Sequence, residues 1–155
     1  MLATSLFLAN CEVSSMTANT QEYRSESLEK TLRKLHLAVS GVKASVIVNF
    51  DGLLVSAFPA FDDENYEEHP TSSPQVAAMS ATLVGLAQRT LRRLAQGELE
   101  RLMMFAEAGV MIVYPAGEAM LAVLVDKETK PGMLLYAASR ACDEIKEILG
   151  FADKK

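Results

Sequence analysis

The stretch SSPQVAAMSATLVGLAQ, residues 72–88, lies within a segment between Glu68 and Arg89 that carries no Asp, Glu, Lys or Arg. Ser73 suits a helix N-cap and Pro74 the first helical position, so we predict a helix from Ser73 to about Gln96 that ends before Gly97. A surface helix normally carries charge on its wet face. About four uncharged turns therefore predict cover on more than one side. The segment is too short and too polar to cross a membrane, so the expected cover is protein.

This predicted helix has two apolar stripes roughly 140° apart at 100° per residue. The first is expected to pack on the chain's own sheet and contains Val76, Met79, Leu83, Leu86, Ala87, Thr90 and Leu94. The second has the spacing of a helix-to-helix seam and is expected at a homodimer interface: Ala77, Ala81, Val84, Gln88, Leu91 and Ala95. One sheet cannot bury both stripes. The alternative is a monomer in which an acidic loop or the first helix covers the second stripe.

The remaining elements follow from periodicity and turn residues. Residues 25–39 and 131–149 show helical spacing of apolar side chains. Residues 44–50 and 53–58 are predicted strands joined by a two-residue turn at Asp51-Gly52, the strongest short-range hairpin signal. Residues 99–106, 110–114 and 119–125 are predicted to form an antiparallel meander. Because these last runs are almost continuously apolar, both faces of the sheet are expected to be covered.

Length and composition narrow the class of protein. A chain of 155 residues predicts one domain, here residues 23–150, with a flexible extension at 1–22 and a tail at 151–155. The net charge of −5 argues against a nucleic-acid binder. The two cysteines have no metal or redox spacing, and we expect no catalytic residue, metal or cofactor. His36 is expected to be a partly buried structural histidine, and residues 61–69 a solvated acidic loop rather than a calcium site.

The N-terminus resembles an export signal only loosely. Residues 8–11 are similar to a lipoprotein cleavage box, but no basic residue precedes the apolar run. We therefore expect a cytoplasmic protein without an integral membrane segment.

Several stretches resemble the roadblock / dynein-light-chain family, particularly its stand-alone bacterial and archaeal members. They are the hairpin at residues 48–55, the helix stretch at 79–87, and residues 97–102 and 132–136. The resemblance spans residues 28–149. It implies an α+β fold of order α-β-β-α-β-β-β-α, with a five-stranded antiparallel sheet, the long helix on one face and two helices on the other. It also implies a dimer formed through the long helix and the following strand, which adds Leu102, Met103 and Met104 to the expected interface.

The resemblance further implies a function through protein contacts. Bacterial relatives pair with small Ras-like GTPases, and the gliding-motility type activates its partner by repositioning the partner's own loops. We therefore expect a non-catalytic homodimeric regulator or scaffold, with Arg89, Arg92 and Arg93 as candidate partner contacts. The alternatives are a passive scaffold indifferent to nucleotide state and a small-ligand sensor domain.

Overall fold

The computed structural model describes residues 2–60 and 73–151, with side chains described from Thr20 onward within them. Three helices and five strands follow one another in the predicted order. They are α1 (Leu2–Ala38), β1 (Val42–Asn49), β2 (Leu54–Phe58), α2 (Pro74–Arg93), β3 (Leu102–Phe105), β4 (Gly109–Ala116), β5 (Ala119–Asp126) and α3 (Pro131–Leu149).

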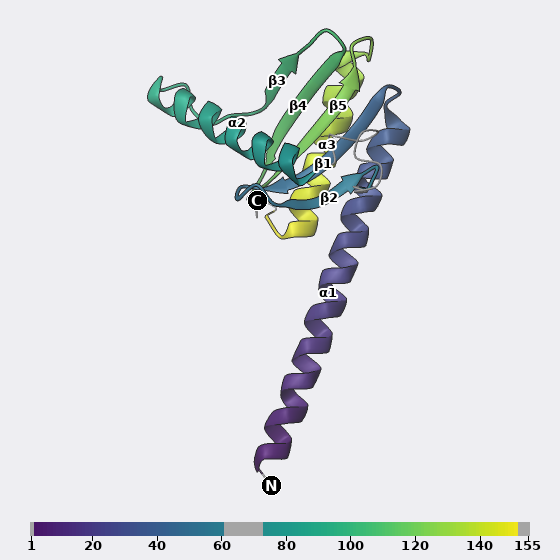
Figure 1. Ribbon diagram of the computed structural model, residues 1–155, viewed down its shortest axis with the longest axis vertical. Helices are drawn as coiled ribbons and strands as arrows, with labels where there is room; N and C mark the ends of the chain where they lie inside the picture. The colour runs from purple at the N-terminus through teal and green to yellow at the C-terminus, as the bar shows by residue number, and fades with distance from the viewer. Residues whose placement is uncertain (1, 61–72, 152–155) are drawn as a thin grey trace.

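The strands form a single sheet in the order β2-β1-β5-β4-β3, and neighbouring strands are antiparallel. Helix α2 covers one face, while α1 and α3 cover the other (Figure 1). The predicted α+β fold class is therefore confirmed. Strand β3 is shorter than the run 99–106 that predicted it, and it lies at the sheet edge, paired only with β4.

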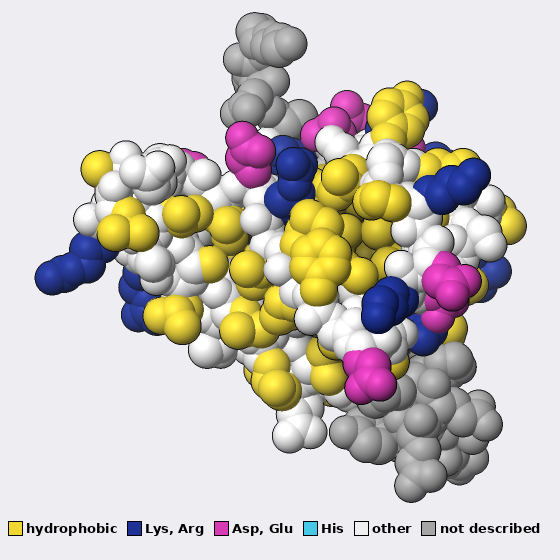
Figure 2. Space-filling view, turned by 90° about the horizontal axis from the view of Figure 1, so that it is seen from above, with side chains coloured by type: hydrophobic (Ala, Val, Ile, Leu, Met, Phe, Trp, Pro, Cys, Tyr) yellow, Lys and Arg dark blue, Asp and Glu magenta, His cyan; other side chains and the backbone are white. Residues whose placement is uncertain are grey.

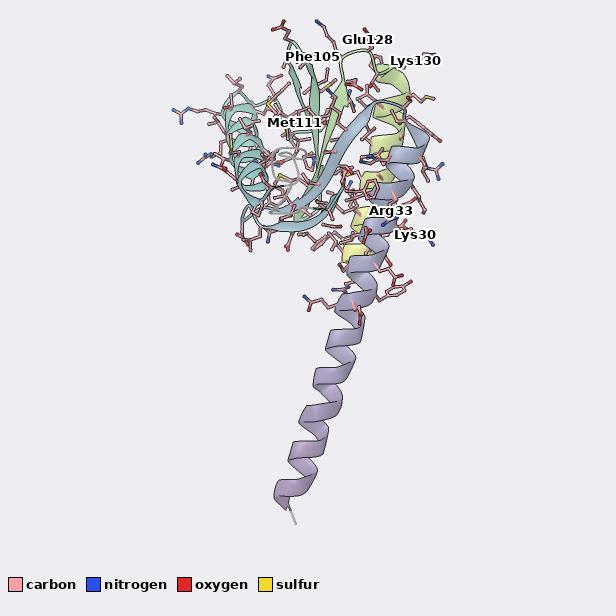
Figure 3. All side chains as sticks on the ribbon, turned by 45° about the vertical axis from the view of Figure 1, so that its right-hand side comes forward. Lys30, Arg33, Phe105, Met111, Glu128 and Lys130 are labelled. Carbon is pink, nitrogen blue, oxygen red and sulfur yellow. The ribbon has the colours of Figure 1, made fainter. Side chains whose placement is uncertain are left out.

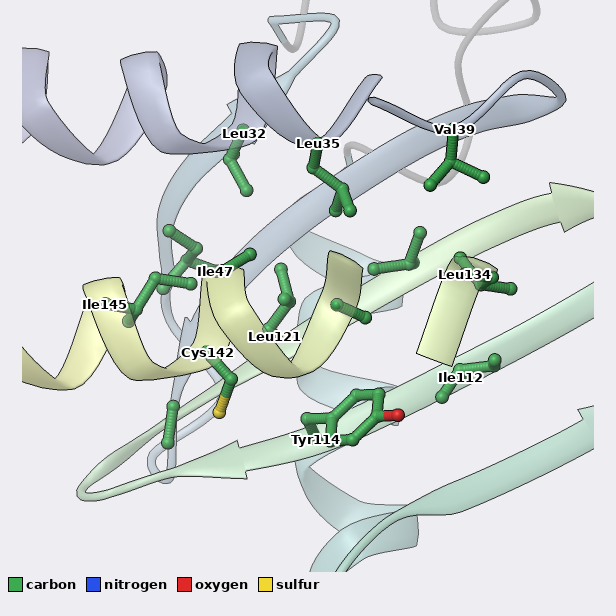
Figure 4. Close-up of a cluster of buried hydrophobic side chains, with 14 of the residues drawn as sticks. Leu32, Leu35, Val39, Ile47, Ile112, Tyr114, Leu121, Leu134, Cys142 and Ile145 are labelled. Atoms are coloured by element: carbon green, nitrogen blue, oxygen red, sulfur yellow. The ribbon is translucent and has the colours of Figure 1, made fainter. Parts of the chain in front are cut away.

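The larger core lies between the sheet and the α1–α3 pair (Figure 4). Leu32 and Leu35 of α1 and Ile145 of α3 meet Ile47 of β1 and Leu121 of β5 there. A smaller cluster on the other face packs beneath α2. Because β5 is central and covered on both faces, its side chains from Met120 to Val123 are all buried. This explains why the sequence of β5 does not alternate between apolar and polar residues.

The β1–β2 hairpin is confirmed, but its turn is longer than predicted. The N–H of Asn49 donates to the carbonyl oxygen of Leu53 at 3.0 Å, so three residues, Phe50 to Gly52, form the turn. Gly52 donates to the carbonyl of Asn49 at 3.0 Å and has a φ of 83°. This is the three-residue hairpin in which the last turn residue is left-handed, a conformation that glycine adopts without steric cost.

Helix α1 also differs from expectation. The backbone is helical from Leu2, whereas the sequence pattern predicted a helix from Ser25 after a flexible extension. Figure 1 shows the N-terminal half of α1 projecting away from the sheet. The apolar spacing that predicts a domain helix begins only at Leu28, because only the C-terminal part of α1 packs on the sheet. Within the described chain, no helix combines the length and hydrophobicity needed to cross a bilayer.

Candidate protein-interaction surface

Both ends of α2 are held by local interactions. The Oγ atom of Ser73 accepts a hydrogen bond from the N–H of Val76 at 3.2 Å, which confirms the predicted N-cap. At the other end, the guanidinium of Arg92 donates two hydrogen bonds to the Glu98 carboxylate, at 3.2 and 3.0 Å. The Ser73 cap marks where α2 begins, and the exposed Arg92–Glu98 pair links the end of the helix to the segment that leads to β3.

The structure reverses the two stripes predicted for this helix. Ala77, Ser80 and Val84 are buried beneath α2, where Ala77 and Val84 pack among the sheet residues Val46, Val48, Val113, Met120 and Ala122. Ala77 and Val84 were expected at a dimer interface, but both are fully buried in the single chain and so are not accessible to a second copy in this conformation. The physical reason is volume. The sheet already fills this layer with valine and methionine side chains, so the small residues of the helix face it.

The other members of the expected interface lie in several environments. Ala81 is half-buried against the cluster beneath α2, and Gln88 and Leu91 are half-buried further along the helix. Ala95 follows the helix end and is exposed.

The stripe expected to face the sheet is instead exposed. Met79, Leu83, Leu86 and Leu94 show exposed fractions between 37% and 61%. A single copy of the chain thus presents about two turns of apolar helix, from Met79 to Leu86, and the C-cap residue Leu94 to water. The inference that one sheet cannot hide both stripes holds, with their roles exchanged.

The adjacent face of the sheet is also incompletely covered. Figure 1 shows the C-terminal end of α2 extending beyond the sheet rather than lying over β3. By strand register, Leu102 pairs with Val113 and Met104 with Met111, so these residues share the face on the α2 side. Leu102, Met104 and Met111 are only half-buried. Figure 2 shows hydrophobic side chains spread from α2, at the left, across the middle of this view.

We define the α2 surface as Met79, Leu83 and Leu86 of α2, its C-cap residue Leu94, and Leu102, Met104 and Met111 of the sheet. It adjoins the edge strand β3, whose outer backbone groups face no other strand of the part of the chain that the structure describes. Met103 and Phe105 occupy the alternate register positions of β3 and so belong to the opposite face of the sheet. Phe105 is 75% exposed at the end of this strand (Figure 3).

The predicted partner-binding arginines differ in whether they form an ion pair. Arg89, Arg92 and Arg93 are all exposed. Hydrogen bonding to Glu98 raises the pKa of Arg92, and the same contact lowers the pKa of Glu98. Arg89 and Arg93 form no ion pair with the residues that the structure describes. They flank the exposed stripe, because Arg89 is three and Arg93 seven residues after Leu86.

The side chains of His36 and Cys142 both contact packed neighbours. His36 lies 3.0 Å from the Oγ atom of Ser45 and meets the ring of Phe58 edge-on, with ring centroids 4.7 Å apart. Burial lowers the pKa of His36. Cys142 is buried, and its Sγ atom lies 3.2 Å from the carbonyl oxygen of Pro115. Over the described ranges, no group of three or more His, Cys, Asp or Glu side chains is positioned to hold a metal ion.

Comparison with known proteins identifies the family. The family model of the Roadblock/LC7 domain matches residues 28–125. This chain belongs to the Roadblock/LC7 family. An uncharacterized protein of Methanocaldococcus jannaschii is 32% identical to this Roadblock/LC7 chain over 120 residues, which cover 77% of this chain and 96% of the relative.

Solved Roadblock/LC7 structures share the fold at lower identity. A Roadblock/LC7 domain from Streptomyces avermitilis is similar with a TM-score of 0.70 at 21% identity, covering 79% of this chain and 97% of that one. The gliding protein MglB from Thermus thermophilus is similar with a TM-score of 0.68 at 16% identity, covering 83% and 93%. The family resemblance read from the sequence is thus confirmed.

Sequence reasoning predicted two apolar stripes on α2 but exchanged the buried stripe and the exposed one. A signal was present, because Ala77, Ser80, Ala81 and Val84 form the stripe with the smaller side chains. Small side chains allow a helix to approach a sheet of bulky residues closely. Met111 was not predicted to lie at the surface, because the sequence analysis expected both faces of the sheet to be covered.

Proposed function

We propose that this protein is a non-catalytic homodimer that binds and regulates a small Ras-like GTPase in the cytoplasm. The observation that carries the proposal is the α2 surface, an apolar helix stripe beside a free strand edge. Monomeric proteins rarely expose contiguous apolar areas of this kind unless they are binding sites. Its position on two adjacent elements favours a protein partner over a small ligand, because the surface is broad and open.

A two-fold dimer accounts for both parts of the surface. Pairing α2 with the α2 of a second copy would cover Met79, Leu83 and Leu86 on each chain. Pairing β3 with β3 would satisfy the free strand edge and place Met104 at the centre of the contact. An exposed edge strand can pair with strands of other molecules and cause aggregation, and pairing within a dimer would prevent this.

The GTPase proposal rests on family membership and on the charge of the same helix. Family members of the gliding type share this fold, and here Arg89 and Arg93 extend from α2 without an ion pair among the described residues. Two copies would bring two such pairs together. Regulation through contact requires no catalytic group from this chain, since a GTPase supplies its own phosphate-binding loops and metal.

The test is binding of a Ras-like GTPase encoded by the same genome, loaded either with GDP or with a non-hydrolysable GTP analogue. Calorimetry is expected to give a dissociation constant at least about tenfold lower for one nucleotide state. The double variant Arg89→Glu/Arg93→Glu should weaken that binding, whereas Arg140→Glu on the opposite layer should leave it unchanged. Absence of binding to both states would refute a regulator of that GTPase.

A passive scaffold is the second candidate, favoured by the apolar character of the α2 surface, which needs no nucleotide-dependent contact. It predicts equal affinities for the two loaded forms and an unchanged rate of GTP hydrolysis. The same titration therefore separates the two functions.

A further inference from the structure

A second groove lies on the opposite side of the sheet, between α1 and α3. The two helices run antiparallel, because Ala38 at the end of α1 and Met133 near the start of α3 line the same end of the groove. In its middle, the Oε2 atom of Glu144 accepts hydrogen bonds from Thr31 Oγ1 at 3.2 Å and from Lys34 Nζ at 3.1 Å. Figure 3 shows α1 and α3 together on the side of the molecule away from α2.

Two hollows lie along these helices. One, of about 490 Å³, is lined by the more buried alanines Ala137 and Ala141 and by the exposed Ala38. A second, of about 440 Å³, lies further along the same helices at Ser27 and Ile148. The stretch of α1 from Thr20 to Ala38 that lines them spans about 27 Å at 1.5 Å per residue. A helix of about 18 residues matches that length.

Apolar side chains stand along the rims of this groove. Tyr23 of α1 is 71% exposed and Tyr136 of α3 is 66% exposed, and Met133 is also exposed. The guanidinium of Arg140 lies over the Tyr136 ring, 6.0 Å from its centroid. Aromatic and methionine side chains around a surface depression are typical of protein-binding sites.

The occupant that fits best is itself a helix. The groove is formed by two helices. Their backbone N–H and C=O groups are already hydrogen-bonded within α1 and α3, so they cannot pair with an extended strand. A helix satisfies its own backbone and presents only side chains to the groove, as in helix-in-groove recognition.

Charge selects the kind of helix. The ionisable side chains that line the two hollows are three cations, Arg24, Lys34 and Arg140, and two carboxylates, Glu144 and Glu147. Lys34 and Thr31 already bind one carboxylate, that of Glu144. With Lys34 paired to Glu144, two cations, Arg24 and Arg140, stand against one carboxylate, that of Glu147, so the lining carries one net positive charge in a chain whose net charge is −5.

We propose that the α1–α3 groove binds an amphipathic helix of a partner protein, with small and aromatic residues on its apolar face and Asp or Glu beside them. The groove is separated from the α2 surface by the sheet, so a third protein can be held while α2 is engaged. This inference does not depend on the proposed GTPase function.

The test uses the full chain as bait for a displayed library of peptides of about 18 residues, patterned as amphipathic helices with randomised flanks. Selected peptides are expected to carry acidic flanks. Ala38→Arg, which fills the groove at an exposed position, and Arg140→Glu should each weaken their binding by at least about tenfold. Arg93→Glu is the matched control, because it makes the same charge change on α2 and should have no effect. Circular dichroism checks that each variant is folded.

Three outcomes would overturn the proposal. One is the absence of any enriched helical peptide, and another is enrichment of peptides with basic flanks or with binding insensitive to Ala38→Arg. The third is a fall in the solution mass of the free protein on Ala38→Arg, which would mean that a second copy of this chain occupies the groove.

Discussion

Gly52 in the β1–β2 turn lies directly against Ala78 of α2. A Cβ atom placed on Gly52 would come within 3.0 Å of the Ala78 Cα atom, closer than side chains normally approach backbone. The turn therefore seats the first half of α2 close to the hairpin. This close approach is possible because the helix presents small residues here, and it leaves the larger ones, such as Met79, facing outward.

Gly52→Ala is expected to destabilise the protein. Alanine at a φ of 83° costs about 1–2 kcal/mol, and the added methyl must also displace α2. Urea denaturation should show a lower free energy of unfolding by at least that amount. Gly85→Ala is the control, because nothing lies within 4 Å of its added methyl. In a helix interior that change should stabilise by about 0.5–1 kcal/mol. Equal effects of the two substitutions would contradict this packing of the turn on α2.

Ser73→Ala is expected to lower stability by about 1 kcal/mol. Its hydroxyl caps α2, and the residue is buried, so water cannot replace the lost hydrogen bond. The measurement is again the free energy of unfolding in urea. Thr82→Ala removes a hydroxyl from an exposed position of the same helix and should have little effect. A Ser73 variant as stable as the Thr82 variant would show that the cap contributes nothing.

Stability is expected to fall as the pH drops below the ordinary pKa of histidine, about 6.5. Burial lowers the pKa of His36 in the folded protein, so the unfolded chain binds a proton more readily. The stabilising contribution is complete above that pH and is lost as the pH falls through the lower folded pKa. His36→Gln should remove this part of the pH dependence between about pH 5 and 7. Parallel curves for the variant and the parent chain would rule out His36 as the cause.

Much of the fold could be predicted from local sequence. Ser73-Pro74 marked the start of α2, and the Asp51-Gly52 pair marked the hairpin, because both signals depend on backbone chemistry within a few residues. The turn length was missed, since a three-residue turn with a left-handed third position uses the same Asp-Gly pair. The start of α1 was missed because its first half packs on no other element and so needs no apolar periodicity.

Which stripe of α2 is exposed was harder to predict, for a physical reason. Periodicity shows that α2 has two apolar stripes, but it carries no information on which of them the sheet can accommodate. That choice depends on the volumes of Val46, Val113 and Met120 across the interface, residues far apart in sequence. Arg92 illustrates the same limit, because its pairing with Glu98 depends on how the chain turns after the helix.

Leu86→Glu is expected to break the proposed dimer without unfolding the protomer. Leu86 is exposed in the single chain, so the new carboxylate would be hydrated there but buried against α2 of a second copy. Sedimentation should show a dimer dissociation constant raised at least about tenfold. Leu37→Glu is the matched control, since it makes the same substitution at an exposed leucine of α1, which covers the other face of the sheet (Figure 1). Loss of association in both variants would place the contact elsewhere.

The central claim is that a second copy covers the α2 surface, and the most direct test is the solution mass of the unaltered chain. Light scattering over a micromolar concentration series should give about twice the chain mass of 16.9 kDa. A mass of one chain throughout the series would contradict the account, because Leu83 and Leu86 would then remain in water.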